Sequence, residues 1–268
     1  MKITLFTTNQ ARHNYLVNLL SNIATELNVV QEIKTNVTKI VPGHYSASNV
    51  MKEYFEKVIY AQKKLFGNSS ISVKNKNINL LPLENVHLNN CSIKFLSDFL
   101  KSDVYVVFGS SYIKGELADF LISHKALNIH MGVSPYYRGT DCNFWALYDN
   151  NPHLVGATIH MLSKGLDSGP ILYHALSEIK DDPFLYTMST VKSAFHSLVE
   201  KIKNESIFKY SPEIQNKSKE VRYSRKNDFN DEVVKMFLSK KINLNSKVFE
   251  AKLYNDPYFL KNSDFQNF

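Results

Sequence analysis

The first 33 residues constrain the fold more than any other part of the chain, because two kinds of apolar pattern alternate in them. Residues 2–8, KITLFTT, form a short apolar run typical of a buried strand, and residues 27–33 form another. Between these runs, residues 10–24 carry apolar side chains at helical spacing. A strand, a helix and a strand in this order are a βαβ unit, so we predict an α/β fold with a mostly parallel, twisted sheet flanked by helices.

The same kinds of pattern continue along the chain. The run at 104–108, VYVVF, is apolar throughout, which is typical of a central parallel strand. Residues 153–161 and 170–178 are both strand-like, and the tight GLDSG loop between them favours an antiparallel pair of 155–160 with 171–176 at one edge of the sheet. The other elements that we expect are a turn-like stretch at 41–49, an inserted helix at 50–66, a strand at 78–83, and helices at 92–101, 142–150 and 184–203.

The end of the chain differs from the rest. Residues 210–268 have little aliphatic periodicity and many Asn, Lys, Asp and aromatic residues. We therefore expect a main domain at 1–205 and a small C-terminal accessory region at 206–268.

Composition narrows the choice of partner and compartment. The net charge of +7 favours an anionic partner. Eight basic residues at 201–226 are mixed with glutamates, so we expect a solvated face there and not a nucleic-acid site. No apolar run is long enough for a membrane span, the start has no signal-peptide pattern, and Cys91 and Cys142 lack metal-ligand spacing. These features favour a cytoplasmic protein whose two thiols are reduced.

The turn after the first strand is a candidate anion site. Thr7, Thr8 and Asn9 can cap the following helix, whose N-terminus presents free backbone N–H groups. Arg12 and His13 lie one turn in and would add positive charge. We therefore expect Asn9, Arg12 and His13 to contact an anionic substrate, with an ordinary capped helix as the alternative.

Three polar side chains at strand ends could carry chemistry. Asn128 and His130 alternate with aliphatic residues, so on a strand both leave the same face, and Asp167 follows in the GLDSG turn. An imidazolium and an amide can stabilise an oxyanion, and a carboxylate can accept a proton from an attacking amine. No Ser or Cys is placed as a nucleophile, so the set indicates direct acyl or proton transfer. A structural histidine and a turn aspartate remain the alternative.

A second loop, GSSYIKG at 109–115, follows the predicted central strand. Ligands of open parallel sheets bind beyond the carboxyl ends of the strands, so this loop and the segment 128–130 should meet at one edge. The loop lacks the glycine spacing and the GK[ST] ending of a phosphate loop. We therefore do not interpret it as a nucleotide site.

The order of these motifs resembles the signature of the 10-formyl-tetrahydrofolate-dependent formyltransferases. ALNIHMGVSPYYRGTD, at 126–141, contains an Asn-x-His pair and a loop with Pro and Arg-Gly, and GLDSGPIL, at 165–172, contains the later Asp. The family includes glycinamide-ribonucleotide, methionyl-tRNA and sugar-nucleotide N-formyltransferases. The resemblance covers 1–205, most closely 104–172, and it implies a Rossmann-like catalytic domain there.

The resemblance also implies roles for individual residues. Asn128 and His130 would hold the formyl oxyanion, and Asp167 would assist removal of the amine proton. The co-substrate would be 10-formyl-tetrahydrofolate, without a metal, and Arg138 would anchor an anionic group. The residues implied at the pterin ring, largely through backbone groups, are Phe108, Gly109, Ser110, Ser111, Tyr112, Ile113 and Leu166. Many relatives carry bulkier residues where this chain has GSS, so the contacts implied there are those of the backbone.

The resemblance favours one class of acceptor. Methionyl-tRNA formyltransferases carry a larger C-terminal domain than this chain has, and glycinamide-ribonucleotide enzymes have a Gly-rich loop where this chain has TTNQAR. Sugar N-formyltransferases of lipopolysaccharide and O-antigen pathways fit better. They imply a nucleotide-sugar substrate, such as a dTDP- or GDP-4-amino-4,6-dideoxyhexose, and a homodimer.

Three other functions stay open at this point. A methionyl-tRNA formyltransferase-like enzyme would use the same catalytic part. A formyl-tetrahydrofolate hydrolase would use the same three polar residues with water as acceptor. An inactive binding module would keep the fold and have no need of all three residues.

Overall fold

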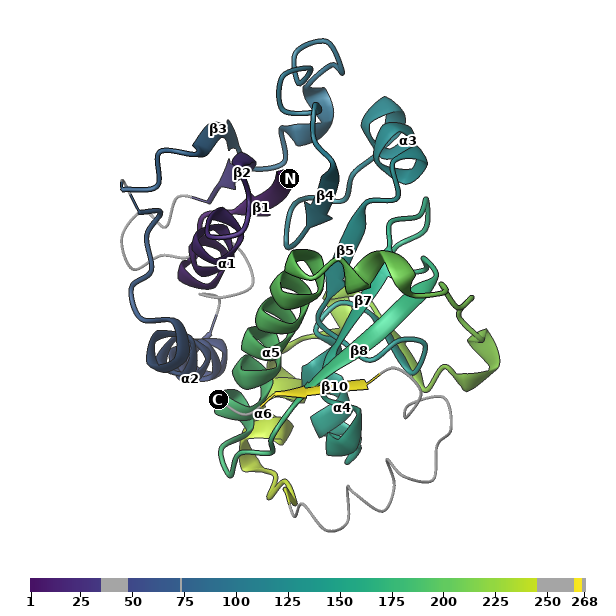
Figure 1. Cartoon of the computed structure of the whole chain (residues 1–268). Helices are drawn as coiled ribbons and strands as arrows, with labels where there is room; N and C mark the ends of the chain where they lie inside the picture. The colour runs from purple at the N-terminus through teal and green to yellow at the C-terminus, as the bar shows by residue number, and fades with distance from the viewer. Residues whose placement is uncertain (35–47, 73, 245–262, 267–268) are drawn as a thin grey trace.

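The main structural element is a single sheet of eight strands in the order β10-β8-β7-β5-β4-β1-β2-β3 (Figure 1). The computed structural model describes residues 1–34, 48–72, 74–244 and 263–266. Among the strands of this sheet, only β7 runs antiparallel to its neighbours. The strands are β1 (Lys2–Thr8), β2 (Glu26–Ile33), β3 (Ile78–Glu84), β4 (Val104–Val107), β5 (Leu127–His130), β7 (Ala157–Met161), β8 (Ile171–Ser177) and β10 (Ser263–Gln266). The predicted α/β fold with a mostly parallel sheet is confirmed.

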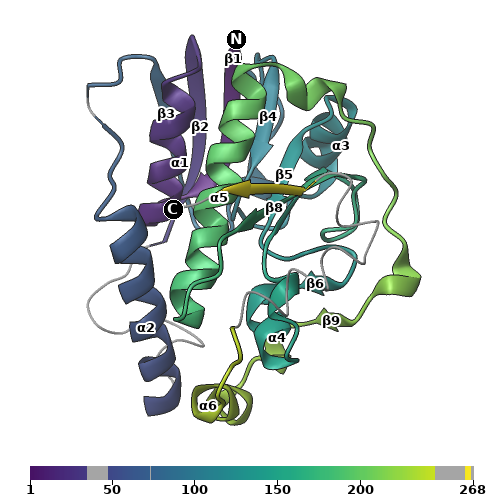
Figure 2. The same ribbon diagram turned by 60° about the horizontal axis from the view of Figure 1, so that its bottom comes forward.

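Helices cover both faces of the sheet. In Figure 2, α1 and α5 lie side by side on one face, and α3 lies on the other. The helices are α1 (Ala11–Ser21), α2 (Asn49–Phe66), α3 (Gly115–Ser123), α4 (Cys142–Tyr148), α5 (Pro183–Lys203) and α6 (Asp231–Ser239). None of these described helices combines the length and apolar character that a membrane crossing requires.

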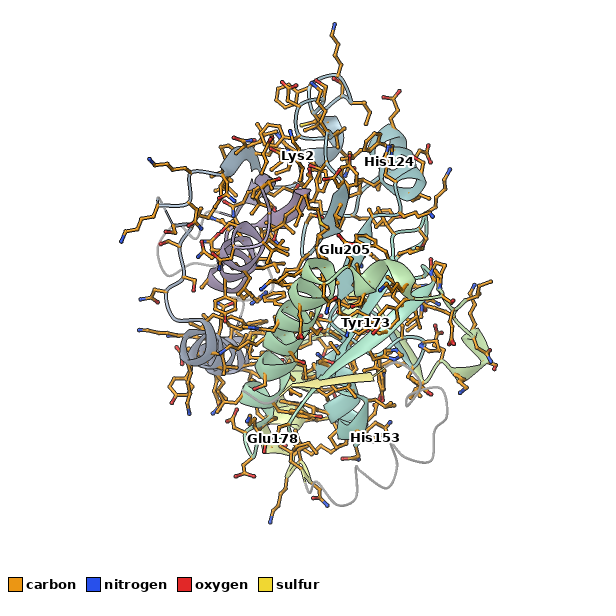
Figure 3. The ribbon with its side chains drawn as sticks, in the orientation of Figure 1. Lys2, His124, His153, Tyr173, Glu178 and Glu205 are labelled. Carbon is orange, nitrogen blue, oxygen red and sulfur yellow. The ribbon has the colours of Figure 1, made fainter. Side chains whose placement is uncertain are left out.

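The largest apolar core lies between the sheet and the α1–α5 layer. Leu16 and Leu20 of α1 and Phe195 and Leu198 of α5 are all fully buried there. Burying one such side chain contributes about 1.5–3 kcal/mol. Tyr173 of β8 lies beneath α5, where its hydroxyl is 3.0 Å from the Ser197 hydroxyl (Figure 3). This core fixes the sheet from which the site residues project.

A second core, rich in aromatic rings, joins segments that are far apart in the sequence. In the lower part of Figure 2, α2, α4 and α6 lie together. Tyr54 of α2 has its ring centroid 5.2 Å from Phe184 of α5, 5.3 Å from Phe229 and 5.9 Å from Phe237 of α6. Edge-to-face pairs at such distances add to the stability that area burial gives. The core thus ties α2 to residues near the C-terminal end.

Residues after α5 also join the main body. The short strand β9 (Arg222–Ser224) pairs in parallel with β6 (Tyr137–Gly139), and β10 extends the main sheet beside β8. The antiparallel β7–β8 pair is therefore confirmed, but its expected position at the edge is wrong, because β10 lies outside it.

Three local predictions were also wrong. Residues 92–101 form successive turns, because their backbone hydrogen bonds mix three-residue and four-residue spacings and never repeat as in an α-helix. The cap of α1 is Gln10, which makes no side-chain cap bond, while Thr7 and Thr8 still belong to β1. Residues 153 and 154, the first two of the strand expected at 153–161, belong instead to the 3-10 turn Pro152–Leu154. Most of the turn-like stretch predicted at 41–49 lies outside the described residues.

Candidate active site

A cavity of about 550 Å³ opens at the carboxyl ends of β4 and β5. Ligands of parallel sheets bind at this edge, since loops from neighbouring strands converge there. The lining includes Asn128, His130, Asp167 and Leu166, together with all of residues 108–113. The structure therefore brings together the predicted catalytic residues and the predicted folate loop.

Asp167 contacts both predicted partners. Its Oδ2 lies 3.2 Å from Nδ1 of His130, and its Oδ1 accepts a 3.4 Å hydrogen bond from Nδ2 of Asn128. Alternation on β5 puts the amide and the imidazole on one face of the sheet, as predicted. The GLDSG turn then carries the carboxylate back to them.

The contact between His130 and Asp167 is an ion pair. Burial by itself lowers the pKa of His130, but the Asp167 carboxylate and Cys142 together outweigh burial and hold that pKa well above the ordinary value. Burial likewise raises the pKa of Asp167, but His130 and His160 together outweigh burial and hold that pKa far below the usual range. Nε2 of His130 lies 3.4 Å from the carbonyl oxygen of Tyr137, so both ring nitrogens face acceptors, as an imidazolium requires. The site therefore holds a fixed positive charge next to a carboxylate.

His160 is a member of the site that the sequence reasoning missed. It is 1% exposed, and its Nδ1 lies 2.8 Å from the carbonyl oxygen of Met161, which can only accept. Its Nε2 lies 2.9 Å from Nδ2 of Asn128, and because an amide nitrogen can only donate, Nε2 accepts that hydrogen bond. His160 thus orients the Asn128 amide. In the sequence, the only signal was a histidine in an apolar strand. The structure places this histidine directly opposite Asn128 in the β5–β7 register.

A buried carboxylate holds the loop that follows β4. Glu32 is fully buried at the end of β2, and it accepts hydrogen bonds from the backbone N–H and the hydroxyl of Ser111 at 2.6 and 2.7 Å. Asn89 bonds the loop a second time, donating to the Tyr112 carbonyl and accepting from the Lys114 N–H, each at 2.8 Å. Several bonds thus fix the backbone of the predicted cofactor loop.

Gly109 at the start of this loop is required by its geometry. Its φ is +68°, and a Cβ there would lie 2.5 Å from Nε2 of His13. His13 is 3% exposed, with its ring centroid 4.8 Å from that of Phe108. Burial, Arg12 and Lys34 together hold the pKa of His13 well below its ordinary value. The prediction that His13 adds positive charge is therefore wrong, although His13 does line the cavity.

The other predicted anion contacts divide into two groups. Arg12 lines the cavity and donates to Gln62. Asn9 is not in the lining; its side chain bonds the backbone of Lys34. Arg138 is also outside the lining, because its guanidinium pairs with Glu220 at 3.1 Å.

The walls of the cavity combine apolar and polar side chains. Apolar side chains of Val107, Ile113 and Leu162 line it. Thr140 and His13 also belong to the lining, and the Thr140 hydroxyl and Nδ1 of His13 are buried without a hydrogen-bond partner among the described residues. Among the residues that the structure describes, no group of three or more His, Cys, Asp or Glu side chains could hold a metal ion.

Comparison with known proteins gives a family match over residues 48–207, to the model described as Formyl transferase. A sugar N-formyltransferase structure from Shewanella superposes with a TM-score of 0.52 at 15% identity, over 99% of this chain and 92% of that one. A formyltransferase from Anoxybacillus kamchatkensis, in complex with UDP-4,6-dideoxy-4-formamido-L-AltNAc and tetrahydrofolate, superposes with a TM-score of 0.51 at 17% identity, over 93% and 97%. At these identities, the likeness shows the fold.

Curated sequence relatives match over a shorter range. Methionyl-tRNA formyltransferase of Thermotoga neapolitana is 38% identical over 90 residues, which is 32% of this chain and 28% of that protein. The chain spans between 21% and 28% of the length of such relatives.

Proposed function

Because the chain belongs to the formyl transferase family, we propose that it is an N-formyltransferase that uses 10-formyl-tetrahydrofolate and a nucleotide-linked amino sugar. One observation carries this proposal. Asp167 contacts both His130 and Asn128 at the wall of a cavity that the loop 109–113 also lines. A binding module has no need of a buried ion pair beside an amide at such a place.

The co-substrate supplies a formyl group whose carbonyl carbon can accept an amine. Residues of the chain would then act on the charges and protons of the transfer. The His130 imidazolium places a positive charge where negative charge develops on the carbonyl oxygen, and the buried setting strengthens that interaction. The Asn128 amide would add a second donor, by exchanging its long 3.4 Å bond to Asp167 for a bond to that oxygen.

Asp167 would take the proton that the amine loses. Its carboxylate remains ionised because His130 holds its pKa far below the usual range, so it is available as a base at neutral pH. A carboxylate with so low a pKa is a weak base in the resting site. Transfer of the proton through water, or after the amine has begun to bond to carbon and become more acidic, overcomes that mismatch.

The loop 109–113 would hold the pterin ring through its backbone. Glu32 and Asn89 fix that backbone, so its free groups are presented in one arrangement. The apolar Val107, Ile113 and Leu162 would contact the faces of the ring.

For the acceptor, we infer a nucleotide-linked amino sugar, such as a dTDP- or GDP-4-amino-4,6-dideoxyhexose. Arg12 supplies a cation at the cavity, and the net charge of +7 favours a phosphorylated substrate. The similar structure from Anoxybacillus kamchatkensis was solved with a formylated UDP-sugar and tetrahydrofolate, which supports the same class of ligand.

The direct test is a formylation screen. Purified protein is incubated with 10-formyl-tetrahydrofolate and a panel of nucleotide-linked amino sugars, and the product is detected by a mass gain of one formyl group. We expect product with at least one sugar, and none with the Asp167→Asn variant. Formate release at the same rate without any amine would replace this proposal with the hydrolase.

A second acceptor follows from the sequence relatives, which are methionyl-tRNA formyltransferases. The same screen therefore includes initiator methionyl-tRNA. Formylation of that tRNA, with no turnover of any amino sugar, would decide for this second acceptor.

A further inference from the structure

The segment 213–224 runs along the outside of the loop that carries Asp167. Ile171 and Glu213 exchange both backbone hydrogen bonds, at 2.7 and 2.8 Å, and β9 pairs with β6 farther on. These two attachments hold the segment in place. They position Gln215 beside the turn at 167–169.

Gln215 bonds the backbone of that turn twice. Its Nε2 donates to the carbonyl oxygen of Asp167 and to that of Gly169, each at 2.8 Å. The side chain amide therefore uses both of its N–H groups on one turn, and the residue is 8% exposed. These two hydrogen bonds are shielded from water. Loss of either donor would leave a buried carbonyl group without a hydrogen-bond partner, which is costly.

Asp167 needs such support, because its backbone is in a disfavoured conformation. Its φ is +46°, in the left-handed region that residues other than glycine seldom adopt. Holding a residue there costs on the order of 1–3 kcal/mol, which the surroundings must supply. The bond from Gln215 acts on the carbonyl of the strained residue itself.

Arg138 gives the same loop a second attachment. Its Nη2 donates to the carbonyl oxygen of Leu166 at 3.4 Å, while Nη1 pairs with Glu220 at 3.1 Å. Glu220 belongs to the same segment as Gln215. Two side chains of this segment thus act on consecutive residues of the loop, one directly and one through Arg138.

We propose that Gln215 is a positioning residue for Asp167: it fixes the turn from which the carboxylate reaches His130. Gln215 lies outside residues 48–207, to which the family model matches, so this chain completes its site with a residue from beyond the matched part. The kinetic part of the test rests on the proposed function, whereas the inference itself concerns only the geometry of the pair.

The test compares Gln215→Met, which keeps the length of the side chain and removes the donors, with Ile214→Ala. Ile214 is the adjacent residue and is 85% exposed, so its variant controls for a change in this segment. In Gln215→Met, we expect kcat to fall about 10- to 100-fold, as for a misplacement of about 1 Å, with KM for either substrate nearly unchanged. Ile214→Ala should match the wild type.

A second measurement needs no substrate. The imidazole of His130 is titrated by NMR in labelled protein, and His130→Asn identifies its signal. The groups that face this ring are Asp167, Cys142 and, with centroids 6.4 Å apart, His160. In Gln215→Met, the carboxylate should move away from the ring, so the pKa of His130 should fall toward that of an isolated imidazole.

The outcomes separate the two proposals. If the wild type formylates no acceptor, the proposed function fails, and the titration still decides the role of Gln215. If Gln215→Met lowers only the melting temperature, and leaves kcat and the His130 titration as in the wild type, Gln215 has a merely structural role and the inference is overturned. If that variant does not fold, Gln215→Leu, which also loses the donors and adds no charge, takes its place in both measurements.

Discussion

Oδ2 of Asp167 and Nδ1 of His130 lie 3.2 Å apart, with the two side chains 13% and 6% exposed. The residues are on different elements, and each shifts the pKa of the other in the direction that keeps both charged. A pair of this kind is costly to break on one side only, because the remaining charge is left without its partner. The pair therefore links the stability of the fold to the chemistry of the site.

The first prediction concerns pH. The pKa of His130 is raised on folding, so its contribution to stability is complete below the ordinary value of 6.5 and is lost as pH rises through the folded pKa. The free energy of unfolding of the wild type should thus decline above pH 6.5 by more than that of His130→Asn. Urea denaturation across the alkaline range measures it, and parallel curves for the two proteins would contradict it.

At the acid end, the sign is opposite. The pKa of Asp167 is depressed on folding, so its contribution is present above the ordinary value of 3.8 and is lost as pH falls through the folded pKa. In Asp167→Asn, this acid-dependent loss should be reduced, as acid titration of the unfolding free energy will show. Asp181→Asn, which changes an exposed carboxylate, should behave like the wild type.

The same Asp167→Asn variant should lose catalytic activity and still bind its substrates. The amide keeps the shape of the carboxylate but cannot accept a proton, so kcat should fall by about 10²- to 10⁴-fold. KM should change little, since the walls of the cavity remain. Steady-state kinetics with both substrates measures the two constants separately, and a kcat within twofold of the wild type would rule out Asp167 as the base.

His160 should matter through Asn128. In His160→Leu, the amide of Asn128 loses the acceptor that orients it, and we expect kcat to fall about tenfold, the low end for a mispositioned group. His174→Leu is the matched control, because His174 is also a buried strand histidine, 2% exposed on β8. His174→Leu should lower the melting temperature and leave kcat unchanged. If His160→Leu and His174→Leu changed kcat equally, His160 would be an ordinary core residue.

Glu32 should control binding of the folate. Glu32→Gln weakens the charged hydrogen bonds to Ser111, so the loop should lose its fixed arrangement and KM for the donor should rise roughly tenfold, about 1.4 kcal/mol. Glu26→Gln, at the other end of the same strand, removes a partly exposed pair with Lys2 and should have no such effect. A fall in kcat with unchanged KM would argue against this role.

The pattern of apolar residues predicted those strands and helices that depend mainly on their own sequence. The runs at 2–8 and 104–108 became β1 and β4, and alternation alone put Asn128 and His130 on one face. The prediction at 92–101 failed, because Leu96 and Leu100 have helical spacing while their backbone forms separate turns. Apolar spacing reports which side chains are buried, and it does not report how the backbone bonds between them are closed.

The rest of the site depended on contacts between distant residues. Glu32 and Ser111 are 79 positions apart, and Gln215 and Asp167 are 48 apart. Glu32 and Gln215 do not stand in a motif, and the role of each depends on the partner that the fold brings to it. The β6–β9 pairing, at Tyr137 and Arg222, is of the same kind.

The aromatic core around Tyr54 supports one wall of the cavity from behind. Tyr54, Phe55 and Val58 of α2 line the cavity, while Tyr54 also packs on Phe229 and Phe237. A change of ring size at Phe237 would therefore be transmitted through α2 to the wall of this cavity. Acceptor preference could then drift among homologous chains by substitutions that never touch a ligand, so a survey confined to lining residues would miss part of what determines selectivity.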